Sequence, residues 1–307
     1  MSFKVIKAGI FTTLQDKGRF SFTHLGVTNS GAMDEYAFLS AQKLLNNDTN
    51  TNILEITFSN VELQALTDTT ICITGALCEF YINDELKNTW RTHNIKKNDT
   101  LKIGKIIKGQ RVYLAVKNGF NIPKEFGSNS TTIKESLGGI NGNKIQNNDI
   151  LDYKKYTSNL VQKWKKEYIP NYTDELTLRV LLSYQDDSFN EDEKKKFFNS
   201  TYTITQDFNR MACKLQGESI QSNLDGIISE AISFGSIQIP SDGQPIILLK
   251  EHQTIGGYPK IGTILNIDCF KLAQMKIGSK IKFEEIDIDI AQKKVKRFYS
   301  TLKNHSH

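Results

Sequence analysis

The hydrophobic and polar positions of this chain alternate mainly with the period of two that is typical of β-strands. Short alternating or β-branched runs recur from end to end, and Asn, Asp and Gly residues separate them. These runs predict strands at 3–7, 69–76, 111–116, 176–183, 201–205, 244–249 and 280–285. Asn83 and Asp84 both tolerate positive φ, so the segment 79–87 is predicted to form a hairpin.

Helical periodicity is confined to a few segments. Five apolar residues between 37 and 45 fall on one face, and Asp34 and Glu35 occupy the first turn, where the helix dipole favours anions. Ser188 is expected to cap a second helix, and a short third helix is expected to begin near Asp268. The segment 289–304 predicts an amphipathic helix. Its packed face would be formed by Ile290, Phe298 and Leu302.

Many strands with few covering helices predict a mainly β fold, built as barrels or sandwiches. With 307 residues the chain exceeds the usual size of one core, so two lobes are expected, although a single long β domain stays open. We expect an N-terminal β lobe at 1–160, a polar, lysine-rich connector at 161–175, a second β lobe at 176–290 and a C-terminal helix and tail at 291–307.

The charge and cysteine content argue against a nucleic-acid-binding, zinc-binding or disulfide-rich protein. The net charge is +5, both signs are mixed throughout, and no basic stripe with interleaved aromatic residues points to nucleic acid. The four cysteines fit neither a paired zinc motif nor a disulfide framework, so we expect reduced, buried thiols and no metal site. A secretory signal and a membrane-spanning run are not evident, so a cytoplasmic protein is expected. His305 and His307 lie in a tail that we expect to be frayed.

Three polar clusters in the first half are candidates for chemistry. Gln15, Asp16 and Arg19 can point together from one turn toward a carboxylate or phosphate, or the Asp and Arg can simply brace that turn. Ser30 or Asp34 can cap a helix whose start is also an anion site. The hydroxyls and glycines of 126–145 predict a loop presenting N–H groups, with a plain surface loop as the alternative.

A fourth cluster spans 234–264. It supplies amide groups from three glutamines, one carboxylate and one phenol, while two adjacent glycines allow close backbone approach before a proline. The cluster predicts a corner for a small amide-like or anionic ligand, and a β-bulge that only re-aims a strand is the alternative. By contrast, the segment 104–111 has P-loop glycine spacing but Gln110 in place of lysine, so it is expected to be a hairpin.

Taken in this order, the clusters resemble the family of KipA-like proteins, which is also called the 5-oxoprolinase C-subunit family, allophanate hydrolase subunit 2 or the biotin-dependent carboxyltransferase family. The resemblance extends from "GIFTTLQDKGR" and "GVTNSGAMDEYA" through "FGSNSTT" and "NRMACKLQG" to "EHQTIGGYPKIGTI" and "LAQMKIGSKIKF". It implies a two-lobed β architecture with a cyclophilin-like barrel in one lobe.

The resemblance also implies an enzyme subunit that is active only in a complex. Such chains pair with a KipI-like partner and, with a LamB/YcsF-like partner as the third component, open 5-oxoproline to L-glutamate at the expense of ATP. Two alternatives stay open: a carboxyltransferase module that acts on urea or a similar small amide, and a non-enzymatic antagonist of a KipI-type kinase inhibitor. No tightly bound cofactor is expected. Biotin would come from a separate carrier, because "AQMKIG" at 273–278 lacks the second Met of a biotin hairpin and suits the passage from a helix to a strand.

The site implied by these clusters has two parts. An anionic group would be positioned by Gln15, Asp16 and Arg19, and the lactam would lie at the corner 253–259. The substrate-binding candidates are Gln15, Arg210, Gln238, Gln244, Gln253, Gly256, Gly257, Tyr258 and Pro259. The catalytic candidates are Asp16, Arg19 and Asp34, and Glu55 and Asp242 are further candidates for the general base.

Several positions depart from the pattern of the family that the chain resembles. Asn129 stands where the family usually has Arg, which puts the charge preference for the substrate in question. The other departures are Ala8, Asn209, Ala212 and Ile255.

Overall fold

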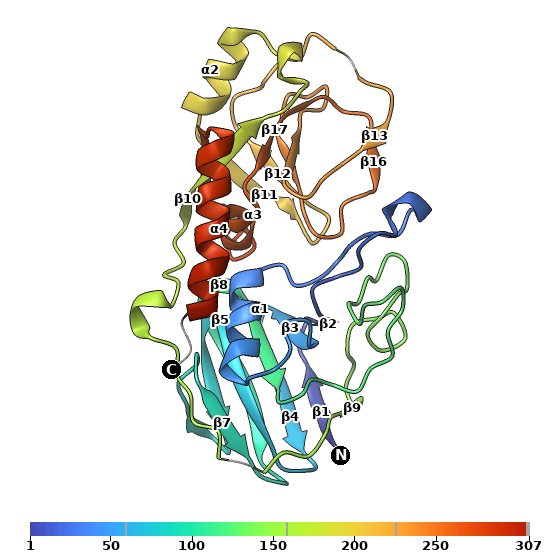
Figure 1. Cartoon of the computed structure of the whole chain (residues 1–307), viewed down its shortest axis with the longest axis vertical. Helices are drawn as coiled ribbons and strands as arrows, with labels where there is room; N and C mark the ends of the chain where they lie inside the picture. Colours follow the sequence, from blue (N-terminus) through green and yellow to red (C-terminus); the bar gives the residue numbers. More distant parts are fainter. Residues whose placement is uncertain (59, 158, 225, 305–307) are drawn as a thin grey trace. The chain divides into compact units, whose positions relative to one another are not determined.

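The computed structural model describes residues 1–304 except 59, 158 and 225, so the predicted fraying at His305 and His307 lies outside the described residues. The chain forms two compact units (Figure 1). Among the described residues, unit 1 comprises 1–20, 30–172 and 301–304, and unit 2 comprises 21–29 and 173–300. Within the described ranges no helix is long and apolar enough to cross a membrane.

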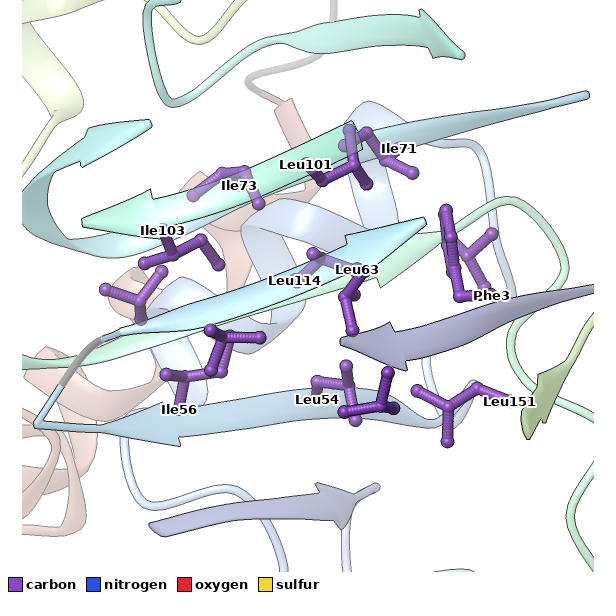
Figure 2. Packing of buried hydrophobic residues seen from close by; sticks show 14 of the residues in the cluster. Phe3, Leu54, Ile56, Leu63, Ile71, Ile73, Leu101, Ile103, Leu114 and Leu151 are labelled. Carbon is purple, nitrogen blue, oxygen red and sulfur yellow. The ribbon is translucent and has the colours of Figure 1, made fainter. Parts of the chain in front are cut away.

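Unit 1 is a nine-stranded sheet in which β2, β3, β8, β4, β1 and β9 are neighbours in that order, and β5 pairs with β6, β7 and β8. The strands are β1 (Ser2–Ala8), β2 (Phe11–Gln15), β3 (Ile53–Thr57), β4 (Val61–Ala65), β5 (Thr69–Ile82), β6 (Glu85–Leu86), β7 (Thr92–Ile95), β8 (Thr100–Val116) and β9 (Ile150–Asp152). Aliphatic side chains from eight of these strands pack into one buried core cluster. Leu54, Ile73 and Leu114 are among them (Figure 2).

The longest strand, β8, shows why one sequence prediction was wrong. The segment 104–111 is not a hairpin, because β8 runs through it and pairs with β5 on both sides of it. Gly109 has a φ of 84°, and the β5–β8 register shifts between Gly75 and Phe80, so the glycine lets the strand bend without reversing. The predicted Asn83–Asp84 turn is confirmed, since both residues have positive φ and Tyr81 pairs with Leu86.

Helix α1 (Glu35–Leu44) lies against β5 and β8 in unit 1 (Figure 1). Asp34 caps it by accepting a hydrogen bond from the Ala37 backbone N–H at 3.1 Å, and Phe38 and Ala41 are buried on the predicted face. Unit 1 also contains a 3-10 helix, η2 (Lys166–Tyr168). The sequence therefore predicted α1, its cap and its buried face correctly.

Unit 2 is a closed barrel with the strand order β10-β17-β14-β15-β12-β11-β18, which confirms the predicted barrel lobe. Its strands are β10 (Glu175–Leu182), β11 (Tyr202–Phe208), β12 (Ala212–Gln216), β14 (Ser236–Gln238), β15 (Ile246–Leu248), β17 (Lys260–Ile264) and β18 (Lys280–Glu285). A separate two-stranded ribbon pairs β13 (Glu230–Ala231) with β16 (Ile255–Gly256). Closure through the parallel β10–β18 pair leaves the barrel without an open edge.

The helices of unit 2 are α2 (Glu191–Asn199), α3 (Asn266–Leu272) and the part of α4 (Ile288–Asn304) up to residue 300. Two 3-10 helices, η1 (Thr23–Leu25) and η3 (Asp186–Ser188), also belong to this unit. The predicted Ser188 cap is wrong, because Ser188 ends η3 and the Asn190 side chain instead accepts from the Glu193 N–H at 2.9 Å. The third helix is confirmed near its predicted start.

The packed face of helix α4 differs from the predicted face. Ile290 is 49% exposed, whereas the neighbouring Ala291 is buried with Phe270 and Leu265. Val295 and Phe298 join this cluster, so the packed stripe of α4 recurs at spacings of four and three residues and begins one position later than predicted. Leu302 is buried, as the sequence predicts.

The four cysteines are free and buried, which confirms the predicted thiols. Cys72 and Cys78 belong to unit 1, and Cys213 and Cys269 belong to unit 2. Burial raises the pKa of the Cys78 thiol to about 12 and also raises the pKa values of Cys72 and Cys269.

Candidate functional site

The carboxylate of Asp16, at the end of β2, fastens the loop that follows residue 127. One oxygen accepts from the Ser128 and Ser130 hydroxyls at 2.6 Å each and from the Gly18 N–H at 2.8 Å, and the other accepts from the Asn129 N–H at 2.8 Å. Asp16 is completely buried. Within the described part of the chain its carboxylate is thus bonded to hydroxyls and amides, and the expected ion pair with Arg19 is not formed.

Arg19 and Gln15 bond to the same loop. The Arg19 guanidinium donates to the Thr132 hydroxyl at 2.8 Å and to the Ser130 carbonyl, and Gln15 Nε2 donates to the Thr131 carbonyl at 3.1 Å. A side chain at Gly138 would collide with that Ser130 carbonyl, and its φ of 66° suits glycine. The loop is therefore held in place by three buried polar side chains of the β2 region.

The reading of 126–145 as a plain surface loop is wrong for its first part, because the five side chains from Ser128 to Thr132 are buried. Asn129, which replaces the arginine of the family pattern, donates from its side chain to the Ile122 carbonyl at 2.7 Å and the Pro123 carbonyl at 3.0 Å. The asparagine thus closes the preceding turn with neutral hydrogen bonds.

Asp34 and Glu55 lie in a second buried network of unit 1. Asp34 accepts from the Tyr172 hydroxyl at 3.0 Å in addition to capping α1, and Glu55 accepts from the Tyr113 hydroxyl and the Met33 N–H at 2.8 Å each. Burial, assisted by these carboxylates, raises the pKa values of both tyrosines well above the ordinary range, so they stay neutral donors. The network anchors the start of α1.

The corner at 253–259 is built around Gly256. Strand β16 pairs Gly256 with Glu230 and Ile255 with Ala231, and the Gly257 carbonyl accepts from the Ile227 N–H at 2.9 Å. Neither glycine of this described corner has a positive φ. A Cβ at Gly256 would instead lie 2.8 Å from Gln238 Nε2 and 3.1 Å from Gln253 Nε2, so the glycine is needed for close approach.

Gln238 is the most unusual side chain at this corner. It is 2% exposed, and its Nε2 has no hydrogen-bond partner among the described residues. A buried amide donor without a partner costs about 1–3 kcal/mol, so proteins rarely retain one unless a water or ligand satisfies it. The structure therefore brings together Gln238, Gln253 and Gly256 as predicted, and it leaves the Gln238 amide donor without a partner among the described residues.

The remaining predicted residues of unit 2 have other partners. Gln244 exchanges two hydrogen bonds with Gly217, at 2.8 and 3.2 Å. Asp242 pairs with Lys214 at 2.8 Å, and Arg210 pairs with Glu251 at 2.6 Å. Asn209 Oδ1 accepts from the N–H groups of Met211 at 2.7 Å and Ala212 at 3.2 Å, so these departures from the family pattern form the turn between β11 and β12. Tyr258 follows Gly257 and is 46% exposed, while the Pro259 carbonyl accepts from Ile239 at 2.9 Å.

Sequence reasoning missed Lys260, which directly follows the corner. Its side chain is buried, its ammonium bonds to the Glu230 carboxylate, and it lies 5.4 Å from the centre of the Tyr184 ring. Gln185 donates to Glu230 at 2.8 Å and accepts from the Lys260 N–H at 2.9 Å. The hydrogen bond from Lys260 is the main cause of the lowered pKa of Glu230. A lysine at the start of a strand with buried isoleucines was the signal available.

Comparison with known proteins shows the family to which the chain belongs. Residues 25–285 match the family model described as carboxyltransferase domain, subdomain A and B. The C subunit of 5-oxoprolinase from Escherichia coli is 34% identical over 94% of this chain and 93% of its own length, and that from Haemophilus influenzae is 32% identical over 92% and 90%. The structure of Kluyveromyces lactis urea carboxylase superposes with a TM-score of 0.94 at 25% identity, covering 99% of this chain and 29% of that one.

The family match spans both units. It includes the loop 128–132, to which Asp16 is bonded, and the corner at Gly256. The two relatives named as the C subunit of 5-oxoprolinase align over nearly their whole length, which confirms the resemblance seen in the motifs. The chain belongs to the family of the carboxyltransferase domain, subdomain A and B.

Proposed function

We propose that this chain is a component of an ATP-dependent 5-oxoprolinase that opens 5-oxoproline to L-glutamate. The two relatives that share about a third of its residues are named as the C subunit of 5-oxoprolinase. In this proposal a KipI-like protein and a LamB/YcsF-like protein are the partners, and the chain is active only with them. An ATP-dependent reaction of this kind would take place in the cytoplasm, where ATP is available.

The observation that carries the proposal is the buried donor Nε2 of Gln238 beside Gly256. A five-membered lactam presents a carbonyl oxygen that accepts hydrogen bonds, and Gln238 Nε2 is a donor without a partner among the described residues. Donation to this oxygen draws electron density from the amide carbon, which eases attack by a nucleophile. The nearby Lys260–Glu230 pair would fix the corner from the barrel side.

ATP enters this proposal as a co-substrate of the complex, and no nucleotide site is assigned to this chain. In unit 1 the bonds of Asp16, Arg19 and Gln15 to the loop 128–132 favour a positioning role for these three residues. The lactam would therefore bind at the corner in unit 2.

A second candidate function is carboxyl transfer to a small amide such as urea. It is favoured by the high TM-score to the urea carboxylase structure and by 27% identity to the urea amidolyase of Lachancea kluyveri over 95% of this chain and 17% of that protein. The Gln238 donor suits a urea carbonyl equally well. Biotin would come from a separate carrier, because Met275 is buried in the link between α3 and β18.

The test is ATP-dependent release of glutamate from 5-oxoproline by this chain mixed with its two partners, with each component omitted in turn. We expect release only when all three are present. A stable three-component complex without turnover would contradict the proposal. Transfer of carboxyl from a biotin carrier to urea by the same chain would favour the second candidate, and tight capture of the KipI-like partner without either activity would favour a regulatory antagonist.

A further inference from the structure

A pocket in unit 1 lies at the β5–β6 hairpin and strand β7, and the corner at Gly256 contributes no residue to it. Its volume is about 480 Å³. The polar and charged part of its lining is formed by Asn83, Glu85, Lys87, Asn88, Arg91, His93 and Asn94. Strand β7 pairs only with β5 in the described sheet, so this pocket lies at an edge of the sheet.

Arg91 is the one arginine among the described residues that line this pocket. Its Nε is buried and has no hydrogen-bond partner within the described ranges. Three other arginines face carboxylates: Arg111 lies 3.9 Å from Glu55, Arg179 lies 2.6 Å from Asp268, and Arg210 lies 2.6 Å from Glu251. Because a guanidinium is a planar fork of donors that stays charged, an uncommitted one in a pocket suits a planar or tetrahedral oxyanion.

The backbone around Arg91 is fixed on both sides. The preceding residue, Trp90, is buried, has a φ of 57° and donates its N–H to the Ile73 carbonyl at 2.6 Å. Arg91 itself forms a backbone bridge with Lys163, and the following residue, Thr92, pairs with Cys72. The guanidinium thus extends from a rigid strand start, which limits the entropy lost on binding a ligand.

The charges of the lining favour an anion. Lys87 pairs with Glu85 at 2.6 Å, but the Glu85 side chain is 75% exposed, and a pair of this kind is weak in water. His93 is held by the Asn88 carbonyl at 2.8 Å, and burial lowers its pKa, with Arg91 and Lys87 lowering it further. The positive charges of Arg91 and Lys87 therefore outnumber the negative charge of Glu85 in the lining.

We propose that this pocket binds a small oxyanion, either a carboxylate or a phosphate, with Arg91 as the bidentate partner and Lys87 as the second cation. The inference is independent of the amide site in unit 2. Carboxylates and phosphates both present the oxygen atoms that a guanidinium recognises. Titration with succinate and with inorganic phosphate distinguishes between these two classes of ligand.

The test follows the imidazole resonances of the full chain by NMR during titration with inorganic phosphate or succinate at constant ionic strength set with potassium chloride. The His93 signal is assigned with His93→Gln. We expect a saturable shift of this signal with at least one probe and a rise in the His93 pKa, because a bound anion stabilises the imidazolium. Arg91→Gln should weaken binding by at least about tenfold, since charge-assisted hydrogen bonds are lost.

The matched control is Lys105→Gln, which removes one positive charge from an exposed position of the same sheet that does not line the pocket. It should bind the probe as the unchanged protein does. If Arg91→Gln does not fold, Arg91→Lys keeps the charge but loses the fork and should still bind more weakly. Shifts of equal size with chloride, or equal affinity in the Arg91 variant and the control, would overturn the proposal.

Discussion

Gln238 and Gln244 are chemically identical residues of one barrel that have opposite surroundings. The amide of Gln244 is satisfied by Gly217, while the Nε2 of Gln238 has no partner within the described chain. Satisfied amides contribute modestly to stability, whereas an unsatisfied buried one costs free energy. The two residues therefore provide a matched pair for separating structure from function.

Replacing Gln238 by methionine removes the unsatisfied donor and nearly keeps the volume. We expect the free energy of unfolding to stay the same or rise by about 1 kcal/mol, since no hydrogen bond is lost. The kcat/KM of the reconstituted complex for 5-oxoproline should fall at least about tenfold, because a donor to the carbonyl is removed. Urea unfolding and steady-state kinetics measure the two effects.

Gln244→Met is the control for this experiment. It removes two hydrogen bonds to Gly217, so it should lower stability by about 1 kcal/mol and leave kcat/KM nearly unchanged. A Gln238 variant that is less stable but fully active would show that its amide has a structural role.

The same contrast shows which features of individual residues could be predicted from the sequence. The sequence shows directly which side chains have amide or charged groups. It also predicted that Gln238, Gln253 and Gly256 lie close together, because all three belong to the cluster at 234–264. Partners between distant segments were not predictable, since the bond between Asp16 and Ser130 spans 114 positions of sequence. Lys260 and Arg91 were missed because a single cation in a strand-like run does not reveal whether it is buried.

At the scale of elements, the contacts of Asp34 at the start of α1 distinguish a helix cap from a catalytic carboxylate. Its carboxylate caps the helix and accepts from Tyr172, and both contacts are available to an asparagine, whose amide can cap through its oxygen and donate to the phenol. A helix cap tolerates this change, whereas a catalytic carboxylate does not.

We therefore expect Asp34→Asn to keep both stability and activity, and Asp34→Ala to lower the free energy of unfolding by about 1–2 kcal/mol. Thermal or urea unfolding of the two variants, with activity assays of the complex, gives the comparison. An Asn variant that folds normally but is inactive would make Asp34 a catalytic acid or base.

Elements with clear periodicity were also the ones predicted best. The apolar face of α1 repeats at helical spacing, and the Asn83–Asp84 turn requires residues that tolerate positive φ, so both were found. The continuity of β8 was missed because Gly104 and Gly109 suit either a turn or a bent strand. Only pairing with β5, which is a contact between segments, decides between the two.

At the scale of the whole molecule, each unit contains a histidine whose pKa is lowered. Burial is the main cause of the lowered pKa of His93 in unit 1 and of His252 in unit 2, relative to an ordinary value of 6.5. On unfolding each ring regains its ordinary affinity for protons, so the unfolded chain binds more protons just below pH 6.5. The contribution of these rings to stability is therefore complete above that pH and is lost as the pH falls.

We expect the free energy of unfolding to fall below about pH 6.5, with at most about 1.4 kcal/mol per pH unit from each histidine. His252→Gln should reduce this slope. Urea unfolding curves collected between pH 7.5 and pH 5 for both proteins provide the measurement, and His24→Gln, at an exposed position, is the control. Parallel curves for the unchanged protein and the His252 variant would contradict the assignment.

The division into units was accessible from sequence only in outline. Length and strand content predicted two β lobes, but the segment 21–29 belongs to unit 2 although both flanking segments belong to unit 1. No change in composition or charge marks the two ends of that segment. Membership of a compact unit depends on contacts, and hydrophobic periodicity does not report contacts between remote segments.

The buried thiols can show which part of the molecule unfolds first. A thiol that is enclosed and protonated does not react with alkylating reagents, because only the exposed thiolate is nucleophilic. Since unit 1 and unit 2 have two such cysteines each, the order in which the four become alkylated records which unit opens first. The native cysteines thus report the local unfolding of each unit to an alkylating reagent, with no engineered reporter residue.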